Sequence, residues 1–222
     1  MKDYILDPQI LENFCKDFIK KIRKYQLSYY IKDKGSTSSR ENIIHSAIIW
    51  SREAINRINS SPIIKKESKD IIDLLTLINL IDLLLESTHQ IYRVLYFKEE
   101  DNFCLNKKLI FRNLPEQYSN LNNIQCFKEI RAMFSSHPIN LSEPRENKKR
   151  FADIPCGSKT MIKLRNYDCD FYIRLWTATK KDKDTIYFKL YIDDLIEFSQ
   201  MIYSYFPTFQ DRVNKIANKK IY

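Results

Sequence analysis

Arg131 and His137 are the residues whose types and spacing point most directly to chemistry. They lie six positions apart in the segment Phe127–Leu141, which reads FKEIRAMFSSHPINL. An arginine guanidinium can hold a phosphate through two parallel hydrogen bonds. A histidine exchanges a proton close to neutral pH. Together, two such groups have the chemistry to bind and cleave a phosphodiester.

The two side chains can approach each other only if the helix that carries them ends before His137. Six residues on one straight helix leave two side chains about 120° apart. Pro138 disfavours a helical conformation at His137, so we expect the helix to end there. An imidazolium at a helix C-terminus is stabilised by the macrodipole, which favours a protonated His137.

Apolar residues at helical spacing predict the elements that position this pair. Asp7 can cap the first helix, with Pro8 at its first position. The other helices expected before residue 141 are Arg40–Ser60, a segment from Ser61–Pro62 to Phe97 with a break near Ser68, a short helix around Cys104–Arg112, and a helix that is capped by Asn122 or Asn123 and ends at Pro138.

The character of the chain changes after residue 141. Alternating residues at Phe171–Thr177 and Ile186–Ile192 predict a β-hairpin, and Met161–Arg165 is a candidate third strand. Asp193 or Asp194 is expected to open a helix that runs to about Tyr205, with a break at Pro207 and a final helix after it. The expected fold class is mainly α: a bundle of four to five helices in residues 1–141, then a basic linker, hairpin and C-terminal helices in residues 142–222, packed on the bundle as an α+β unit.

Composition limits the possible functions. The 222 residues contain only two glycines, which favours helices over strands. The net charge of +9 favours a polyanionic partner. The five cysteines form no C-x-x-C pair, and no glycine-rich phosphate loop or H-E-x-x-H motif occurs. The start MKDYILDP lacks an apolar signal core, and the apolar run Ile71–Leu85 contains two aspartates. We therefore expect a cytoplasmic protein with no membrane span, metal or cofactor.

The segment around Arg131 and His137 resembles the HEPN superfamily (higher eukaryote and prokaryote nucleotide-binding domain). The family signature is an arginine, four to six residues of any kind and a histidine, within an all-helical bundle. The resemblance covers roughly residues 1–141 and rests on Arg131, His137 and the helical context. The context Ile-Arg-x5-His-Pro is also similar to uncharacterised bacterial proteins of this kind.

The resemblance implies a metal-independent endoribonuclease of a toxin–antitoxin, phage-defence or CRISPR-linked system. Arg131 and His137 would be its catalytic residues, RNA its substrate, and a homodimer its active form. A cognate antitoxin or defence-system subunit is the implied protein partner. Family members often have a polar residue after the arginine, where this chain has Ala132, so Ser135 and Ser136 are candidates to supply hydroxyl donors.

Two further groups of polar residues have a functional and a plain interpretation. A basic segment after the motif either neutralises phosphates or is a solvated linker; it contains Arg145, Lys148, Lys149, Arg150, Lys159, Lys163 and Arg165. A stripe on the third helix either lines a cleft or faces solvent; it consists of Asp82, Glu86, His89 and Arg93.

Three function classes therefore remain open. The first is the endoribonuclease. The second is a non-catalytic nucleic-acid-binding module on the same scaffold. The third is a protein-interaction subunit that uses the hairpin edge. A second Arg–His pair, Arg40 and His45, lies among isoleucines, and we interpret His45 as a packing or surface residue.

Overall fold

The computed structural model describes residues 4–25, 40–96, 109–111, 113–136, 141–142, 149–152, 156–157, 169–177 and 186–218. These residues are mainly helical, with a small antiparallel sheet, which confirms this part of the expected fold class. The elements are α1 (Pro8–Tyr25), α2 (Arg40–Ser60), α3 (Ile71–Leu95), a 3-10 turn η3 (Glu116–Tyr118), α4 (Asn123–Arg131), a π turn η4 (Ala132–Ser136), β1 (Leu141–Ser142), β2 (Lys149–Ala152), β3 (Cys156–Gly157), β4 (Phe171–Thr177), β5 (Ile186–Leu190), α5 (Ile192–Tyr203) and α6 (Tyr205–Asn218).

The chain divides into two compact units that are interleaved in sequence. Unit 1 comprises Met1–Ser60, Leu80–Phe103 and Ser199–Tyr222, and unit 2 comprises Ser61–Asn79 and Cys104–Phe198. Helices α3 and α5 each contribute residues to both units. The domain boundary expected at residue 141 stays a prediction.

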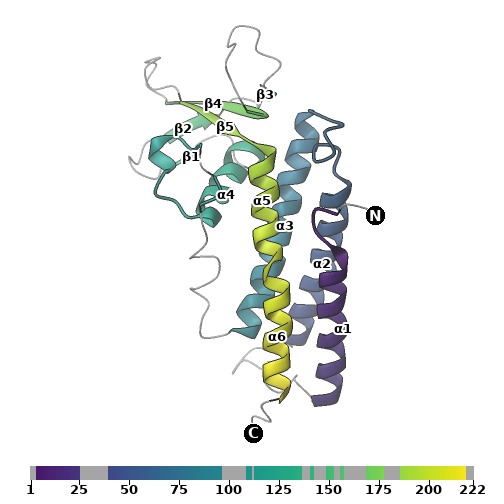
Figure 1. Ribbon diagram of the computed structural model, residues 1–222. Coiled ribbons are helices and arrows are strands. Elements are labelled where there is room, and N and C mark those ends of the chain that lie inside the picture. Colours follow the sequence, from purple (N-terminus) through teal and green to yellow (C-terminus); the bar gives the residue numbers. More distant parts are fainter. Residues whose placement is uncertain are drawn as a thin grey trace. The chain divides into compact units, whose positions relative to one another are not determined.

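Unit 1 is built around an aromatic core between helices from the two ends of the chain. Figure 1 shows α1 and α6 side by side, and α1 also packs against α2. The rings of Phe14 on α1 and Phe206 on α6 meet edge to face, with centroids 5.7 Å apart. On α2, six residues at helical spacing are buried: Ile44, Ala47, Ile48, Ser51, Ile55 and Ile58.

The N-terminus of α1 is fixed to α5 by the hydroxyl of Tyr203. This hydroxyl accepts a hydrogen bond from the Leu11 amide at 3.0 Å and donates one to the Asp7 carbonyl oxygen at 2.6 Å. The Asp7 carboxylate also accepts from the amide of Gln9 at 3.0 Å. The expected start of this helix, with Asp7 before Pro8, is confirmed.

Helix α3 begins later than we predicted. Residues 61–67 form turns, with a hydrogen bond of 2.8 Å from the Glu67 amide to the Pro62 carbonyl. The helix starts at Ile71 because Asp70 caps it: its carboxylate accepts from the Ile72 amide at 2.6 Å. The expected start at Ser61–Pro62 is therefore wrong, although the break expected near Ser68 does fall within the segment before α3.

Unit 2 contains the sheet, whose central strand is β4 (Figure 1). On one side β4 pairs with β5, with Ile173 opposite Phe188. On the other side it pairs with β2 and β3, all antiparallel. The predicted hairpin strands are thus confirmed, while the candidate strand Met161–Arg165 lies outside the described residues.

The aromatic core of unit 2 joins α4 to α5 and to the sheet. The ring of Phe127 stacks on Phe198 at 4.7 Å between centroids. Phe188 on β5 meets Tyr118 at 5.6 Å and Phe134 at 6.1 Å, both edge to face. These contacts hold α4 and the π turn after it in a defined register.

One expectation about another helix is also wrong, and a second lies mostly outside the described residues. Pro207 does not break a helix but lies in the first turn of α6, where an amide donor is not needed; the interruption falls at Ser204. The described part of the segment Cys104–Arg112, residues 109–111, is not helical. Here the Ile110 amide donates to the side chain of Asn123 at 2.8 Å instead.

Among the described residues, no helix is both long enough and apolar enough to cross a bilayer. The longest, α3, has 25 residues. It carries Asp73, Asp82, Glu86 and Arg93 along its length, as expected for a helix that packs within protein.

Candidate functional site

Arg131 is the last residue of α4. The helix starts with a capping box, in which Asn122 accepts from the Gln125 amide at 2.9 Å and the Gln125 side chain accepts from the Asn122 amide at 3.0 Å. Of the two caps expected for this helix, Asn122 and Asn123, the structure has Asn122. Arg131 is half-buried, with its Nε atom inaccessible to solvent, so only part of the side chain is open to a ligand.

The residues that follow Arg131 form the π turn η4. The Ala132 amide at the end of α4 is shared between the carbonyl oxygens of Lys128 and Glu129. Isolated π turns are rare and occur frequently at functional sites. This one spans Ala132–Ser136, the whole interval between Arg131 and residue 137.

Two buried side chains anchor the π turn. Met133 and Phe134 are 1% and 3% exposed, and Phe134 packs on Phe188. Ile130 before them is also fully buried. These buried side chains flank the half-buried Arg131 and Ala132.

Burial changes the acid–base properties of two neighbours on α4. It raises the pKa of the Glu129 carboxyl above its ordinary value of 4.5. Burial also raises the pKa of the Cys126 thiol to about 12. The Cys126 thiol donates to the Leu121 carbonyl oxygen at 3.6 Å, and its nearly complete burial makes it a structural residue.

Several predicted site residues cannot be placed beside Arg131. His137, Arg145, Lys148, Lys159, Lys163 and Arg165 lie outside the described residues. Lys149 and Arg150 belong to β2, where Arg150 pairs with Leu141 on one side and Thr177 on the other. Ser135 and Ser136 belong to the π turn. The convergence of Arg131 with His137 therefore stays a prediction.

The polar stripe on α3 belongs to unit 1, whereas Arg131 belongs to unit 2. Glu86 and Arg93 are exposed, and Asp82 and His89 are half-buried. The cleft expected along this stripe stays a prediction as well.

The second Arg–His pair has a structural explanation at His45. The imidazole ring meets Phe18 edge to face, with centroids 6.0 Å apart. Its Nε2 atom lies 3.8 Å from a carboxylate oxygen of Glu41, one helical turn earlier. These contacts agree with the interpretation of His45 as a packing residue.

Sequence reasoning missed a cavity of about 290 Å³ in unit 2, which we call the α5 pocket. Three segments line it: the turn before α3, the start of β4 and the first turns of α5. Its residues are Ile63, Ile64, Lys66, Ser68, Lys69, Asp170, Phe171, Ile192, Asp193 and Ile196.

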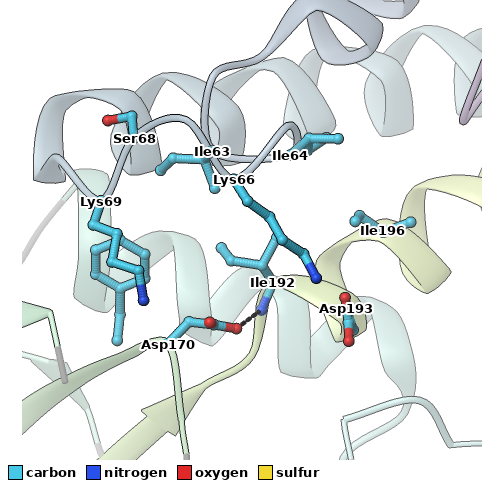
Figure 2. A pocket seen from close by; sticks show the side chains of 10 residues that line it. Ile63, Ile64, Lys66, Ser68, Lys69, Asp170, Ile192, Asp193 and Ile196 are labelled. Carbon is cyan, nitrogen blue, oxygen red and sulfur yellow. Dashed lines mark hydrogen bonds between the residues drawn. The ribbon is translucent and has the colours of Figure 1, made fainter. Parts of the chain in front are cut away.

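The α5 pocket has charged groups of both signs around apolar walls. Figure 2 shows Lys66 extending toward Asp193, and Lys69 toward Asp170. Asp170 accepts a hydrogen bond from the Ile192 amide at 2.8 Å. Within the described residues, neither lysine forms an ion pair with either carboxylate.

Comparisons with known proteins find no relative of this chain. No family model matches the chain, and no curated protein or solved structure matches it either. Within the described residues, no group of three or more histidine, cysteine, aspartate or glutamate side chains could hold a metal ion.

Proposed function

We propose that this chain is a HEPN-like, metal-independent endoribonuclease of toxin or phage-defence type. The observation that carries the proposal is the π turn Ala132–Ser136, which follows Arg131 directly and leads to His137. Isolated π turns are rare and occur frequently at functional sites, which supports a functional role for the residues at the ends of this one. The family resemblance assigns catalysis to those two residues.

The chemistry needs no metal because RNA supplies its own nucleophile. The 2′-hydroxyl attacks the adjacent phosphorus, and the bond to the 5′-oxygen of the next nucleotide breaks. His137 takes the proton from the 2′-hydroxyl or gives one to the leaving oxygen. Arg131 holds the phosphate and stabilises the charge that builds on it. DNA lacks the nucleophile, so RNA is the proposed substrate.

A homodimer solves a problem that one histidine leaves open. General acid and general base are needed in the same step, and a single imidazole supplies only one of them at a time. A second copy of the chain would contribute a second His137 and a second Arg131. We therefore propose a symmetric dimer that acts on cytoplasmic RNA and is controlled by a cognate antitoxin or defence-system subunit.

A matched pair of histidine variants tests the proposal in cells. Induced expression of the wild-type chain should slow growth and degrade cellular RNA, and His137→Ala should relieve both effects. His45→Ala is the control, because His45 belongs to the other Arg–His pair but packs on Phe18. Equal toxicity of the His137→Ala variant and the parent would show that the site is wrong.

A non-catalytic nucleic-acid-binding module is the second candidate. Ala132 favours it, since this position after Arg131 carries no polar group in this chain. The module should bind RNA with a steep dependence on salt and leave it intact. Removal of charge at Lys148, Lys149 and Arg150 should weaken that binding, and an unchanged affinity would count against this candidate.

A further inference from the structure

We propose that the α5 pocket binds a small zwitterion with an apolar body, of the class of the free apolar amino acids. The proposal is independent of the endoribonuclease activity, because it concerns none of the residues assigned to catalysis. It rests on the size of the cavity, its apolar walls and the arrangement of its four charges.

The size of the cavity is that of a small-molecule site. Its volume of about 290 Å³ lies near the lower end of the range of about 300–1,000 Å³ that is usual for such sites. The cavity therefore suits a small organic molecule such as an amino acid.

Apolar side chains form much of the lining. Ile63, Phe171 and Ile192 are buried, and Ile64 and Ile196 are half-buried. Water next to such surfaces is displaced favourably by an apolar group. A leucine or phenylalanine side chain would gain from this contact, whereas glycine would not.

The charges match a ligand that carries both signs. The ammonium groups of Lys66 and Lys69 come from the turn before α3, and the carboxylates of Asp170 and Asp193 lie at the start of α5 (Figure 2). Asp170 is already engaged by the Ile192 amide, so Asp193 is the carboxylate available to a ligand ammonium. A ligand carboxylate would lie between the lysines.

The turn that carries the lysines is held in an unusual conformation. Lys66 has a φ of 61°, which places a non-glycine residue in the left-handed region. Backbone strain of this kind concentrates at ligand sites. The Lys66 amide donates to the Ile63 carbonyl oxygen at 3.0 Å, so the turn is ordered before a ligand arrives, which lowers the cost of binding.

Calorimetry on the full chain with four probes tests the proposal. L-Phenylalanine and L-leucine should bind saturably at one site per chain, and glycine should not bind. Phenylalaninamide lacks the carboxylate and 3-phenylpropionate lacks the ammonium, so each should bind at least about tenfold more weakly than L-phenylalanine. Absence of binding by both L-phenylalanine and L-leucine would overturn the proposal. Binding of 3-phenylpropionate as tight as that of L-phenylalanine would also overturn it, in favour of a simple anion site.

Three variants locate the site. Lys66→Asn keeps a residue type that tolerates positive φ but removes the ammonium, and Asp193→Asn removes the free carboxylate. Each should weaken L-phenylalanine binding by about tenfold or more, whereas the control Lys65→Gln, an exposed lysine outside the pocket, should leave it unchanged. Circular dichroism confirms that each variant is folded. Unchanged affinity in both pocket variants would show that the ligand binds elsewhere.

Discussion

Asp170 caps a helix from which it is separated by a whole hairpin. Its carboxylate accepts a hydrogen bond of 2.8 Å from the amide of Ile192, which lies 22 residues later and begins α5. The Asp170 amide in turn donates to the Leu190 carbonyl oxygen at 3.2 Å. One residue therefore closes the base of the β4–β5 hairpin and fixes the start of α5.

The first prediction concerns this cap. Asp170→Ala should lower the free energy of unfolding by about 1–2 kcal/mol, because a helix N-terminal amide loses its acceptor. Urea titration followed by circular dichroism measures the change. Glu67→Gln, an exposed carboxylate in the same unit, is the control and should shift the free energy by less than about 0.5 kcal/mol. A loss no larger than that of the control would show that the Asp170–Ile192 contact adds nothing to stability.

The second prediction concerns the Tyr203 hydroxyl in unit 1. Tyr203→Phe removes a donor and an acceptor, and it leaves the Leu11 amide without its partner in a buried position. The free energy of unfolding should fall by about 1–3 kcal/mol. Tyr4→Phe alters an exposed tyrosine and should have almost no effect. Equal melting temperatures for the two variants would contradict the role given to Tyr203.

The sequence predicts those features of the fold that depend on neighbouring residues better than those that depend on tertiary packing. Helix α2 begins and ends at the predicted residues Arg40 and Ser60, because apolar spacing along one helix is a local property. The start of α3 was mistaken, since Ser61–Pro62 and Asp70 are both plausible starts, and only the three-dimensional packing of the turn selects Asp70. Pro207 was mistaken for a breaker because proline suits the first turn of a helix as well as its end.

Of the two candidate sites, only the one at Arg131 could be predicted from local sequence signals. The position of Arg131 near the end of a helix followed from Asn122 and Pro138 in the sequence. The α5 pocket could not be predicted, because it brings the turn at residues 63–69 together with residues 170–196, about a hundred positions later in the chain. No spacing rule connects Lys66 with Asp193, so their proximity is visible only in the fold.

The third prediction follows from the raised pKa of Glu129. The folded state binds this proton more tightly than the unfolded state, so stability falls as pH rises from the ordinary value of 4.5 through the folded pKa. Glu129→Gln removes the penalty. The variant should therefore melt higher than the parent at about pH 7 and match it near pH 4.

Its control is Glu116→Gln, an exposed glutamate in the same unit. This variant should show no gain in melting temperature at about pH 7. A Glu129→Gln protein that is less stable than the parent at neutral pH would mean that the ionised carboxylate is stabilising, against the direction assigned here.

The fourth prediction concerns thiol reactivity. The pKa of Cys126, about 12, leaves a thiolate fraction of only about one in ten thousand near pH 8. Cys15 and Cys169 are half-buried. Iodoacetamide should modify these two before Cys126, as measured by peptide mass spectrometry of the native protein. Modification of Cys126 at the same rate as Cys15 would contradict its burial.

The cleavage of RNA by the purified chain tests the central claim most directly. The wild-type protein is incubated with single-stranded RNA in excess EDTA, and the new ends are analysed by mass spectrometry. We predict fragments that end in a 2′,3′-cyclic phosphate, their loss in Arg131→Ala and His137→Ala, and their retention in His45→Ala. Intact RNA with the wild-type protein, or equal cleavage by His137→Ala, would contradict the account.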